Sequence, residues 1–304
     1  MKLFFNNNII QVTLLVLSMA CPMLQADVIG SDSAVSTQPF FLFPAAPIIP
    51  NRIANFAWMQ GGFGMQNSLT SLLFDSVFPV SGSVQLNGGT LTLNRDLVFD
   101  NVFDLQGLGT VIGGGHIFSL SPGIASLPST AGAFQDTTLV LNSDLLIKSA
   151  ISFQGTCAVQ GNGHTLTLNN SGSLAINGSL LLQNVILDGV QNSNVQCANP
   201  SSSLTLESVT WIQAGDFNFN QGSFVCNNLA TFKGTSTFSY TTDQISTISA
   251  NSILFLDTGF FFDYNPGAAV QTLIQFIDAT SQLLLNGATL HASGTGLLLT
   301  KGSM

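Results

Sequence analysis

The 304-residue chain has few charged side chains. Only 7% of its residues are Asp, Glu, Lys or Arg, where globular proteins usually have about 25%. Six basic residues stand against fifteen acidic ones, which gives a formal net charge of −9. Binding to nucleic acid requires clustered Lys and Arg side chains at the phosphates. Because Arg52, Arg95, Lys148 and Lys233 are scattered along the chain, the composition predicts no nucleic-acid partner.

Long apolar runs are nearly absent as well. The one continuous run lies near the N-terminus, over Val12–Ala20 (VTLLVLSMA), and it is too short to cross a membrane as a helix. Lys2 precedes it and Ser18-Met19-Ala20 provides a small-x-small cleavage site, so residues 1–26 read as a signal peptide. We therefore expect an exported protein, periplasmic, secreted or on the cell surface, without a membrane span after signal removal.

Cysteine is scarce, and its four positions do not form a familiar framework. Cys21 directly follows the cleavage site, so a lipid anchor on Cys21 is an alternative, although Ser18 stands where such signals usually have a Leu-like residue. The other three are an odd number and form no CxxC, which argues against a disulfide framework and a zinc knuckle. We expect buried apolar thiols, since Cys226 in SFVC takes the place of Leu206 in SLTL.

Tyr and Trp are rare, with two of each against 24 Phe. A Phe-x-Tyr pattern occurs twice, as Phe238-Ser-Tyr240 and as Phe262-Asp-Tyr264. Exposed and aligned, these rings would make a carbohydrate platform. Stacked aromatic rings inside the core are the favoured interpretation.

An internal repeat is what the chain does contain. Residues 90–120 align without a gap to residues 138–168, and 13 of the 31 positions are identical. The matches include Asn94 with Asn142, Asp96 with Asp144 and His116 with His164. Self-similarity at a fixed period is typical of repeat architectures.

Short alternating strands recur at intervals of roughly 20 to 30 residues, which is within the range of solenoid repeats. The segment TLTL, for example, occurs at 90–93 and again at 165–168. Gly and Asn punctuate the strands, and no helical period appears after Val80. Stacked coils explain the recurrence better than a βαβ fold, a sandwich or a barrel. The sequence therefore predicts an all-β, right-handed parallel β-helix over 81–304. The residues expected to be buried in its strands are Leu91, Leu93, Leu139, Leu141, Leu166, Leu168, Leu204, Leu206 and Ile253.

Three further features of the sequence predict local structure. The Pro- and Phe-rich residues 27–80 are interpreted as an N-terminal cap that covers the open end of the solenoid, with a short amphipathic helix across Ile53–Phe74. Residues 121–135 read as a long projecting loop. Four Asn that follow an L-x-L strand are expected to stack at one corner of successive coils: Asn94, Asn142, Asn169 and Asn286.

Segments such as LNGGTLTLN, SLTLESVTW and GNGHTLTLNNSGSLAINGSLLLQNVILDGV resemble coils of exported bacterial right-handed β-helix proteins of the pectin-lyase-like superfold. The chain is similar to uncharacterised surface proteins and adhesin-type passengers built in this way. The resemblance covers roughly residue 81 to the end. It implies the architecture, but not one activity, because this superfold hosts lyases, hydrolases, adhesins and proteins of unknown role.

The two repeated histidines, His116 and His164, are the first chemical candidates. Two coils apart they would lie about 9.6 Å from each other, too far to share a zinc ion. We interpret them as equivalent corner positions without metal or catalytic role. The lead-ins Gly113-x-Gly115 and Gly161-x-Gly163 are not phosphate loops, because no helix and no Lys-Ser/Thr follows.

The carboxylates are the second candidates. A sugar lyase or hydrolase needs converging Asp or Glu, and a lyase usually also a basic residue. The densest set is Asp96, Asp100 and Asp104, which the second unit replaces by Asp144, Lys148 and Ser152. Asp100 and Asp104 are expected to share an outer face. The superfold's paired Asp, Gly-His-Gly and Arg-x-Lys are absent, and solvated corner carboxylates are the favoured interpretation.

These observations favour a structural, surface or adhesion role, with a long uncharged flank that contacts a glycan or a surface protein. No catalytic, cofactor-binding or metal-binding residue is assigned. One alternative is a polysaccharide-active lyase or hydrolase, which a groove with two or more carboxylates and a basic residue would favour. Another is a partial gene product without activity of its own, because the chain ends soon after a strand.

Overall fold

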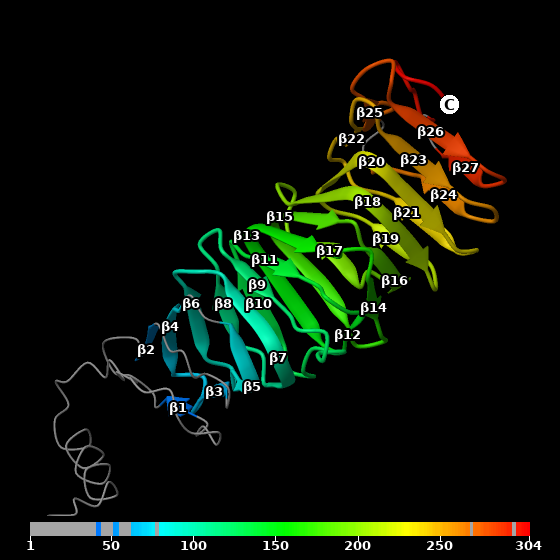
Figure 1. Ribbon diagram of the computed structural model, residues 1–304. Helices are drawn as coiled ribbons and strands as arrows, with labels where there is room; N and C mark the ends of the chain where they lie inside the picture. The colour runs from blue at the N-terminus through cyan, green and yellow to red at the C-terminus, as the bar shows by residue number, and fades with distance from the viewer. Residues whose placement is uncertain (1–40, 44–50, 55–61, 77–78, 268–269, 294–295) are drawn as a thin grey trace, which may run out of the picture.

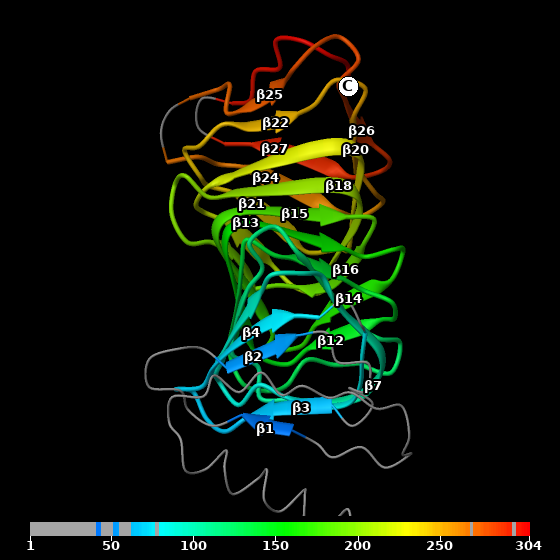
Figure 2. The ribbon, with the colours of Figure 1, turned by 60° about the vertical axis from the view of Figure 1, so that its left-hand side comes forward.

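The computed structural model describes residues 41–43, 51–54, 62–76, 79–267, 270–293 and 296–304. In this part of the chain there are 27 strands and no helix, and every strand pairing is parallel. The strands form about ten coils of a solenoid. Figures 1 and 2 show these coils stacked along one axis, with β1–β5 at one end and β25–β27 at the other. The predicted parallel β-helix is confirmed, whereas the signal peptide lies outside the described residues.

Each full coil contributes to three faces, which we number in chain order. Face 1 is formed by β2 (Asn51–Ala54), β4 (Ser71–Asp75), β6 (Thr90–Leu93), β8 (Thr110–Ile112), β10 (Gly132–Gln135), the first halves of β13 (Ala150–Gln160) and β15 (Ser173–Gln183), and β17 (Val195–Cys197). A separate sheet follows at the same place in the chain order: β19 (Phe217–Phe219), β21 (Thr237–Tyr240), β24 (Phe261–Tyr264) and β27 (Thr289–Ala292).

Face 2 runs through most of the solenoid. It contains the start of β7 (Leu97–Gln106), β9 (Ile117–Ser119), β11 (Thr138–Val140), the second halves of β13 and β15, the first halves of β18 (Ser203–Gln213) and β20 (Ser223–Lys233), β22 (Ser246–Ile248) and β25 (Ile274–Phe276).

Face 3 completes the coil. At the start of the solenoid it contains β1 (Phe41–Phe43), β3 (Gly62–Met65), β5 (Val80–Gln85) and the rest of β7; later it contains β12 (Leu145–Ile147), β14 (Thr165–Leu168), β16 (Ile186–Val190), the second halves of β18 and β20, β23 (Ile253–Leu256) and β26 (Gln282–Leu285).

The core is a set of apolar columns that run through the stacked coils. Strand residues alternate between the interior and the outer surface, so paired residues on neighbouring coils place like side chains on top of each other. The longest column, on face 2, consists of Leu97, Phe118, Leu139, Val159, Leu182, Leu206, Cys226, Ile248 and Phe276. All nine are buried. The predicted equivalence of Leu206 and Cys226 is therefore confirmed.

The coil length varies, as the sequence predicted. The coil that leads from Phe134 to its stacked partner Phe153 is clearly shorter than the coil from Ile248 to Phe276. The spacing of the internal repeat is therefore not a whole number of coils. As a result, Leu91 lies on face 1 and its match Leu139 lies on face 2. The two repeat units still resemble each other because all three faces of a coil use the same pattern of a strand followed by a corner.

Eight of the nine predicted strand residues are buried, but Ile253 is not. Ile253 is half-buried on the outside, whereas Leu254 and Leu256 point into the core. The segment Ile-Leu-Phe-Leu has four apolar residues in a row, so its own pattern does not define which side faces inward. The pairing of Leu254 with Ala230 and of Leu256 with Phe232 defines it.

Two segments were predicted wrongly. The described residues of 53–74 form strands rather than a helix, and β2 and β4 join the same ladder as β6. Residues 121–135 do not project as a loop. Ile124, Leu127 and Phe134 are buried, and Ser126 bridges to Leu146 of the next coil. Neither segment shows regular alternation of apolar and polar residues in its sequence. In the structure, short strands and irregular backbone together complete these coils.

Candidate functional site

The corner between faces 2 and 3 has a recurring backbone geometry. Asn162, Asn184, Ser208 and Asn228 occupy it in four consecutive coils, with φ between 49° and 57°. Left-handed φ turns the chain sharply, and Asn tolerates it better than most residues. These four residues form a column at this corner, and they are not the four Asn that the sequence suggested.

The four Asn that the sequence suggested as a column lie at different corners. Asn94 follows face 1, Asn142 follows face 2, and Asn169 and Asn286 follow face 3. Two of their amides bind other groups: Asn142 donates to the Leu120 carbonyl at 2.6 Å, and Asn286 donates to Asp257 at 3.0 Å. The expected stack of these four side chains is therefore wrong.

The outer surface of face 2, between β13 and β20, carries three columns in register. A hydroxyl column contains Thr156, Ser179, Ser203 and Ser223; a central column contains Ala158, Leu181, Thr205 and Val225; an amide-rich column contains Gln160, Gln183, Glu207 and Asn227. Neighbouring members are about 4.8 Å apart along the solenoid. Glu207 is the one charged side chain among these twelve.

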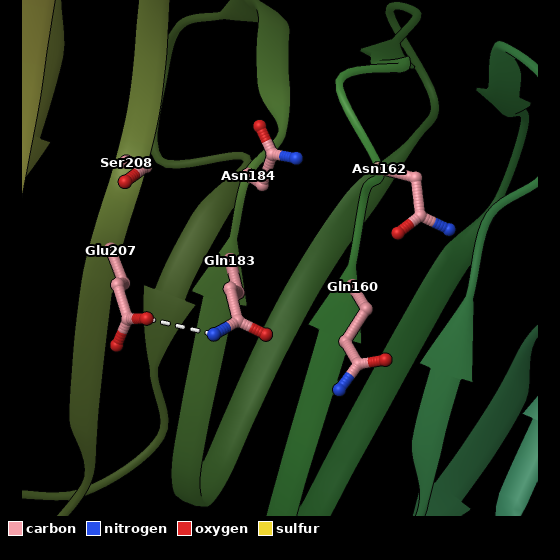
Figure 3. Close-up of a pocket in the computed structure, with 6 residues that line it drawn as sticks. All are labelled: Gln160, Asn162, Gln183, Asn184, Glu207 and Ser208. Carbon is pink, nitrogen blue, oxygen red and sulfur yellow. Dashed lines mark hydrogen bonds between the residues drawn. The ribbon is translucent and has the colours of Figure 1, made fainter.

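The amide-rich column borders a shallow, open hollow of about 410 Å³ at the corner. Six side chains line it: Gln160, Asn162, Gln183, Asn184, Glu207 and Ser208. Figure 3 shows Gln160, Gln183 and Glu207 side by side on neighbouring strands. The Gln183 amide donates a hydrogen bond of 2.7 Å to Glu207 Oε1. The stacking of β13, β15 and β18 thus brings together residues that are far apart in the sequence.

The hollow contains one charged side chain, Glu207. Glu207 is the only Glu in the sequence, and the other five lining residues are uncharged. No basic side chain lines the hollow as the structure describes it. Chemically, it offers one carboxylate and several amide and hydroxyl groups, which suits hydrogen bonding to polar, uncharged molecules.

The structure places the two repeated histidines at different corners. His116 lies between β8 and β9, where the chain passes from face 1 to face 2, and His164 lies between β13 and β14, where it passes from face 2 to face 3. The expected equivalent corners are therefore wrong, for the same reason that the repeat is not a whole number of coils. Their local surroundings nevertheless match.

Each histidine of the chain faces an Asp of the preceding coil. The distances from His Nδ1 to Asp Oδ1 are 3.3 Å for His116–Asp96, 3.6 Å for His164–Asp144 and 2.7 Å for His291–Asp263. Asp96 and Asp144 also accept the backbone N–H of the residue after the histidine, at 3.0 and 2.8 Å. The repeat therefore preserves an Asp–His contact between coils. Among the described residues, no group of three or more His, Cys, Asp or Glu is arranged to hold a metal ion.

Among the described side chains, the carboxylate candidates do not converge with a Lys or Arg. Asp100 is exposed on β7, and the side chain of Asp104 lies outside the described ones. Lys148 donates to the Ser126 hydroxyl at 3.0 Å rather than to a carboxylate. Asp96 contacts His116 instead.

The two arginines do converge, although they are far apart in the sequence. Arg52 hydrogen-bonds to Asp75, and Arg95 Nε lies 3.1 Å from the same carboxylate. The Arg52 hydrogen bond is the main cause that lowers the pKa of Asp75, partly opposed by burial. Arg52 lies one coil before Asp75, and Arg95 lies one coil after it. The sequence separations of these residues, each about one coil, are the signal from which the cluster could have been predicted.

The recurring aromatic pairs belong to the core. Tyr240 and Tyr264 are fully buried and stack with ring centroids 5.5 Å apart, and Phe238 stacks on Phe262 at 5.1 Å. The Tyr264 hydroxyl donates to the Val270 carbonyl at 2.7 Å. The favoured interpretation as stacked core rings is confirmed, and these tyrosines do not provide a carbohydrate platform.

The three described cysteines are free and buried, as predicted. Burial raises the pKa of the Cys197 thiol to about 11 and that of Cys226 to about 12, and it also raises the pKa of Cys157. They are packing residues of the inner columns.

The hollow was not found from the sequence, although a signal exists. The segments LLLQ at 180–183, LTLE at 204–207 and FVCN at 224–227 each end in a polar residue, and that residue is the last outward strand position before the corner. Because these polar residues differ in type, the similarity becomes visible only when the coils are in register.

Comparisons with known proteins found no family model, no curated protein and no solved structure that matches the chain. A membrane-spanning helix is likewise not found among the described residues. The function is therefore inferred from the site itself.

Proposed function

We propose that this chain is an exported β-helix protein, of the pectin-lyase-like type, with a surface or adhesion role, and that it binds a glycan or a surface protein through the outer side of face 2. The observation that supports this proposal is the in-register surface between β13 and β20. Eleven of its twelve outward side chains are uncharged. A regular surface that repeats from coil to coil fits an extended partner.

The physical case depends on what this surface offers. The central column contributes small or apolar contacts from Ala158, Leu181 and Val225, and the flanking columns contribute hydroxyl and amide groups. Such a mixture suits partners with alternating apolar and hydroxyl surfaces. Because this surface itself carries one charged side chain, recognition there depends mainly on shape and hydrogen bonds.

A matched pair of variants tests the surface. Thr205 and Thr210 are both half-buried, outward residues of β18, on faces 2 and 3 respectively. We expect Thr205→Lys to reduce binding of the purified protein to a panel of immobilised glycans and to whole cells about tenfold or more, because the partner would cover an unpaired charge. Thr210→Lys should leave binding unchanged. Equal effects of the two variants would contradict the assignment. Release of soluble sugar fragments by the unaltered protein would instead favour the lyase or hydrolase alternative.

A further inference from the structure

The hollow beside face 2 contains polar groups without protein partners. In the described part of the chain, no hydrogen bond engages the side-chain amides of Gln160 and Asn184 or the hydroxyl of Ser208. Glu207 uses Oε1 to accept from Gln183, and its second oxygen is not engaged by a described residue. These donors and acceptors lie on three neighbouring coils around one open volume.

We propose that this hollow is a binding subsite for an uncharged polysaccharide chain that crosses the coils along the solenoid. The inference rests on the proposed function, because it names the class of partner for that surface. Sugar hydroxyl groups both donate and accept hydrogen bonds, and so they match a lining in which amides, a hydroxyl and a carboxylate alternate.

The charge of the lining selects against acidic polymers. Glu207 and the net charge of −9 repel a polyanion, and no Lys or Arg lines the described hollow to bind its carboxylate, sulfate or phosphate groups. A single carboxylate is also a weak anchor for a polycation in water. An uncharged chain avoids both problems.

The shape of the lining favours a polymer over a single sugar. The hollow is shallow, and the side chains described around it include no aromatic ring on which one sugar could stack. Each hydroxyl that replaces water gains little by itself. However, the amide-rich column continues from Gln160 to Asn227 over four coils. Linked sugars bind several coils at once, so affinity rises with chain length.

Glu207 provides the strongest contact in this subsite. Hydrogen bonds to a carboxylate are roughly twice as strong as neutral ones. The Gln183 amide holds Oε1 and thereby orients the carboxylate so that Oε2 remains for the ligand. Glu207 is therefore a binding residue, and Gln183 a positioning residue.

The test uses the full-length mature protein and neutral oligosaccharides of increasing length. Glu207→Gln retains the shape of the side chain but removes its charge. Asp188→Asn removes one charge from the outer surface of face 3 and is the matched control. We expect affinity to rise with oligosaccharide length, and Glu207→Gln to weaken binding about 5- to 10-fold, while Asp188→Asn binds like the unaltered protein. Unchanged thermal midpoints confirm that both variants fold.

Three outcomes would overturn the inference. If Thr205→Lys abolishes glycan binding while Glu207→Gln does not weaken it, the partner binds face 2 outside the hollow, and the proposed function stands without this subsite. Preference for an acidic polymer, or binding of a protein alone, contradicts the ligand class but not the surface role. If no glycan, protein or cell surface is bound, both proposals fail.

Discussion

At the scale of single residues, polar side chains join one coil to the next. Four Asp residues each accept the backbone N–H of a residue in the following coil: Asp96 from Ile117, Asp136 from Thr156, Asp144 from Thr165 and Asp216 from Thr237. These corner groups would otherwise lack a strand partner, and bonds to carboxylates are strong. The sequence showed the repeated Asp and His but not their contact, because the partner lies one coil away.

The histidines provide the first prediction. Replacing both His116 and His164 by Gln should change the free energy of unfolding by no more than about 1 to 2 kcal/mol, because both rings lie at partly exposed corners and their Asp partners keep the backbone contacts. Urea denaturation followed by circular dichroism measures this. Stoichiometric zinc bound by the unaltered protein and lost from the double variant would contradict the interpretation.

The buried thiols provide the second prediction. In the folded protein Cys197 and Cys226 remain protonated at pH 8, because burial raises their pKa to about 11 and 12. The thiolate is the reactive form, so a thiol reagent at pH 8 should label the native chain far more slowly than the urea-unfolded chain. Rapid labelling of the native protein would contradict the prediction, because it would show that the inner columns that contain these thiols open in the folded state.

The raised pKa values of these thiols also make the free energy of unfolding depend on pH. In the unfolded chain a thiol has a pKa of about 8.5, so between that pH and about 11 to 12 the folded state binds more protons. The thiols' contribution to stability is therefore complete below about pH 8.5 and is lost as the pH rises toward 12. A Cys197→Ala, Cys226→Ala variant, although less stable overall, should lose less stability between pH 8 and 10.5. Denaturant titrations of both proteins across this pH range give the comparison.

At the scale of strands, alternation in the sequence predicts most elements but not all of them. Where Thr and Leu alternate, as in TLTL, the buried side is evident. Where four apolar residues follow one another, as in β23, only pairing with the neighbouring coil selects the buried side. Within residues 121–135, a single bridge at Ser126 stands where other coils have a face 3 strand, and only the short β10 forms a regular strand. Long-range register supplies what local pattern lacks.

Strand β23 provides the fourth prediction. Leu254→Ala should reduce the free energy of unfolding by about 2 to 5 kcal/mol, because it leaves a cavity in a closed column. Ile253→Ala, the adjacent and half-buried control, should cost less than half as much. Chemical denaturation of both variants under one set of conditions gives the comparison. A larger loss for Ile253→Ala would show that the register of this strand is reversed.

At the scale of the whole molecule, the architecture was predictable and the site was not. Recurring strands, corner Gly and Asn, and missing helical periods are all local signals, and together they indicate stacked coils. The hollow is different, because Gln160, Gln183 and Glu207 become neighbours only when successive coils stack in register. Since coil length varies, no fixed period in the sequence reveals that column.

The last prediction concerns where the molecule works. Lys2, the run Val12–Ala20 and Ser18-Met19-Ala20 predict export and cleavage, and a surface role requires both. Expressed in an exporting bacterium, the mature chain should begin near Cys21 or Asp27, as N-terminal sequencing or intact mass would show. The described thiols should remain free in that oxidising environment, because all three are buried and none is paired. Replacing Leu14 and Leu15 by Lys should retain the precursor in the cytoplasm. Intact Met1 on cytoplasmic protein from the unaltered gene would contradict export, and with it the proposed surface role.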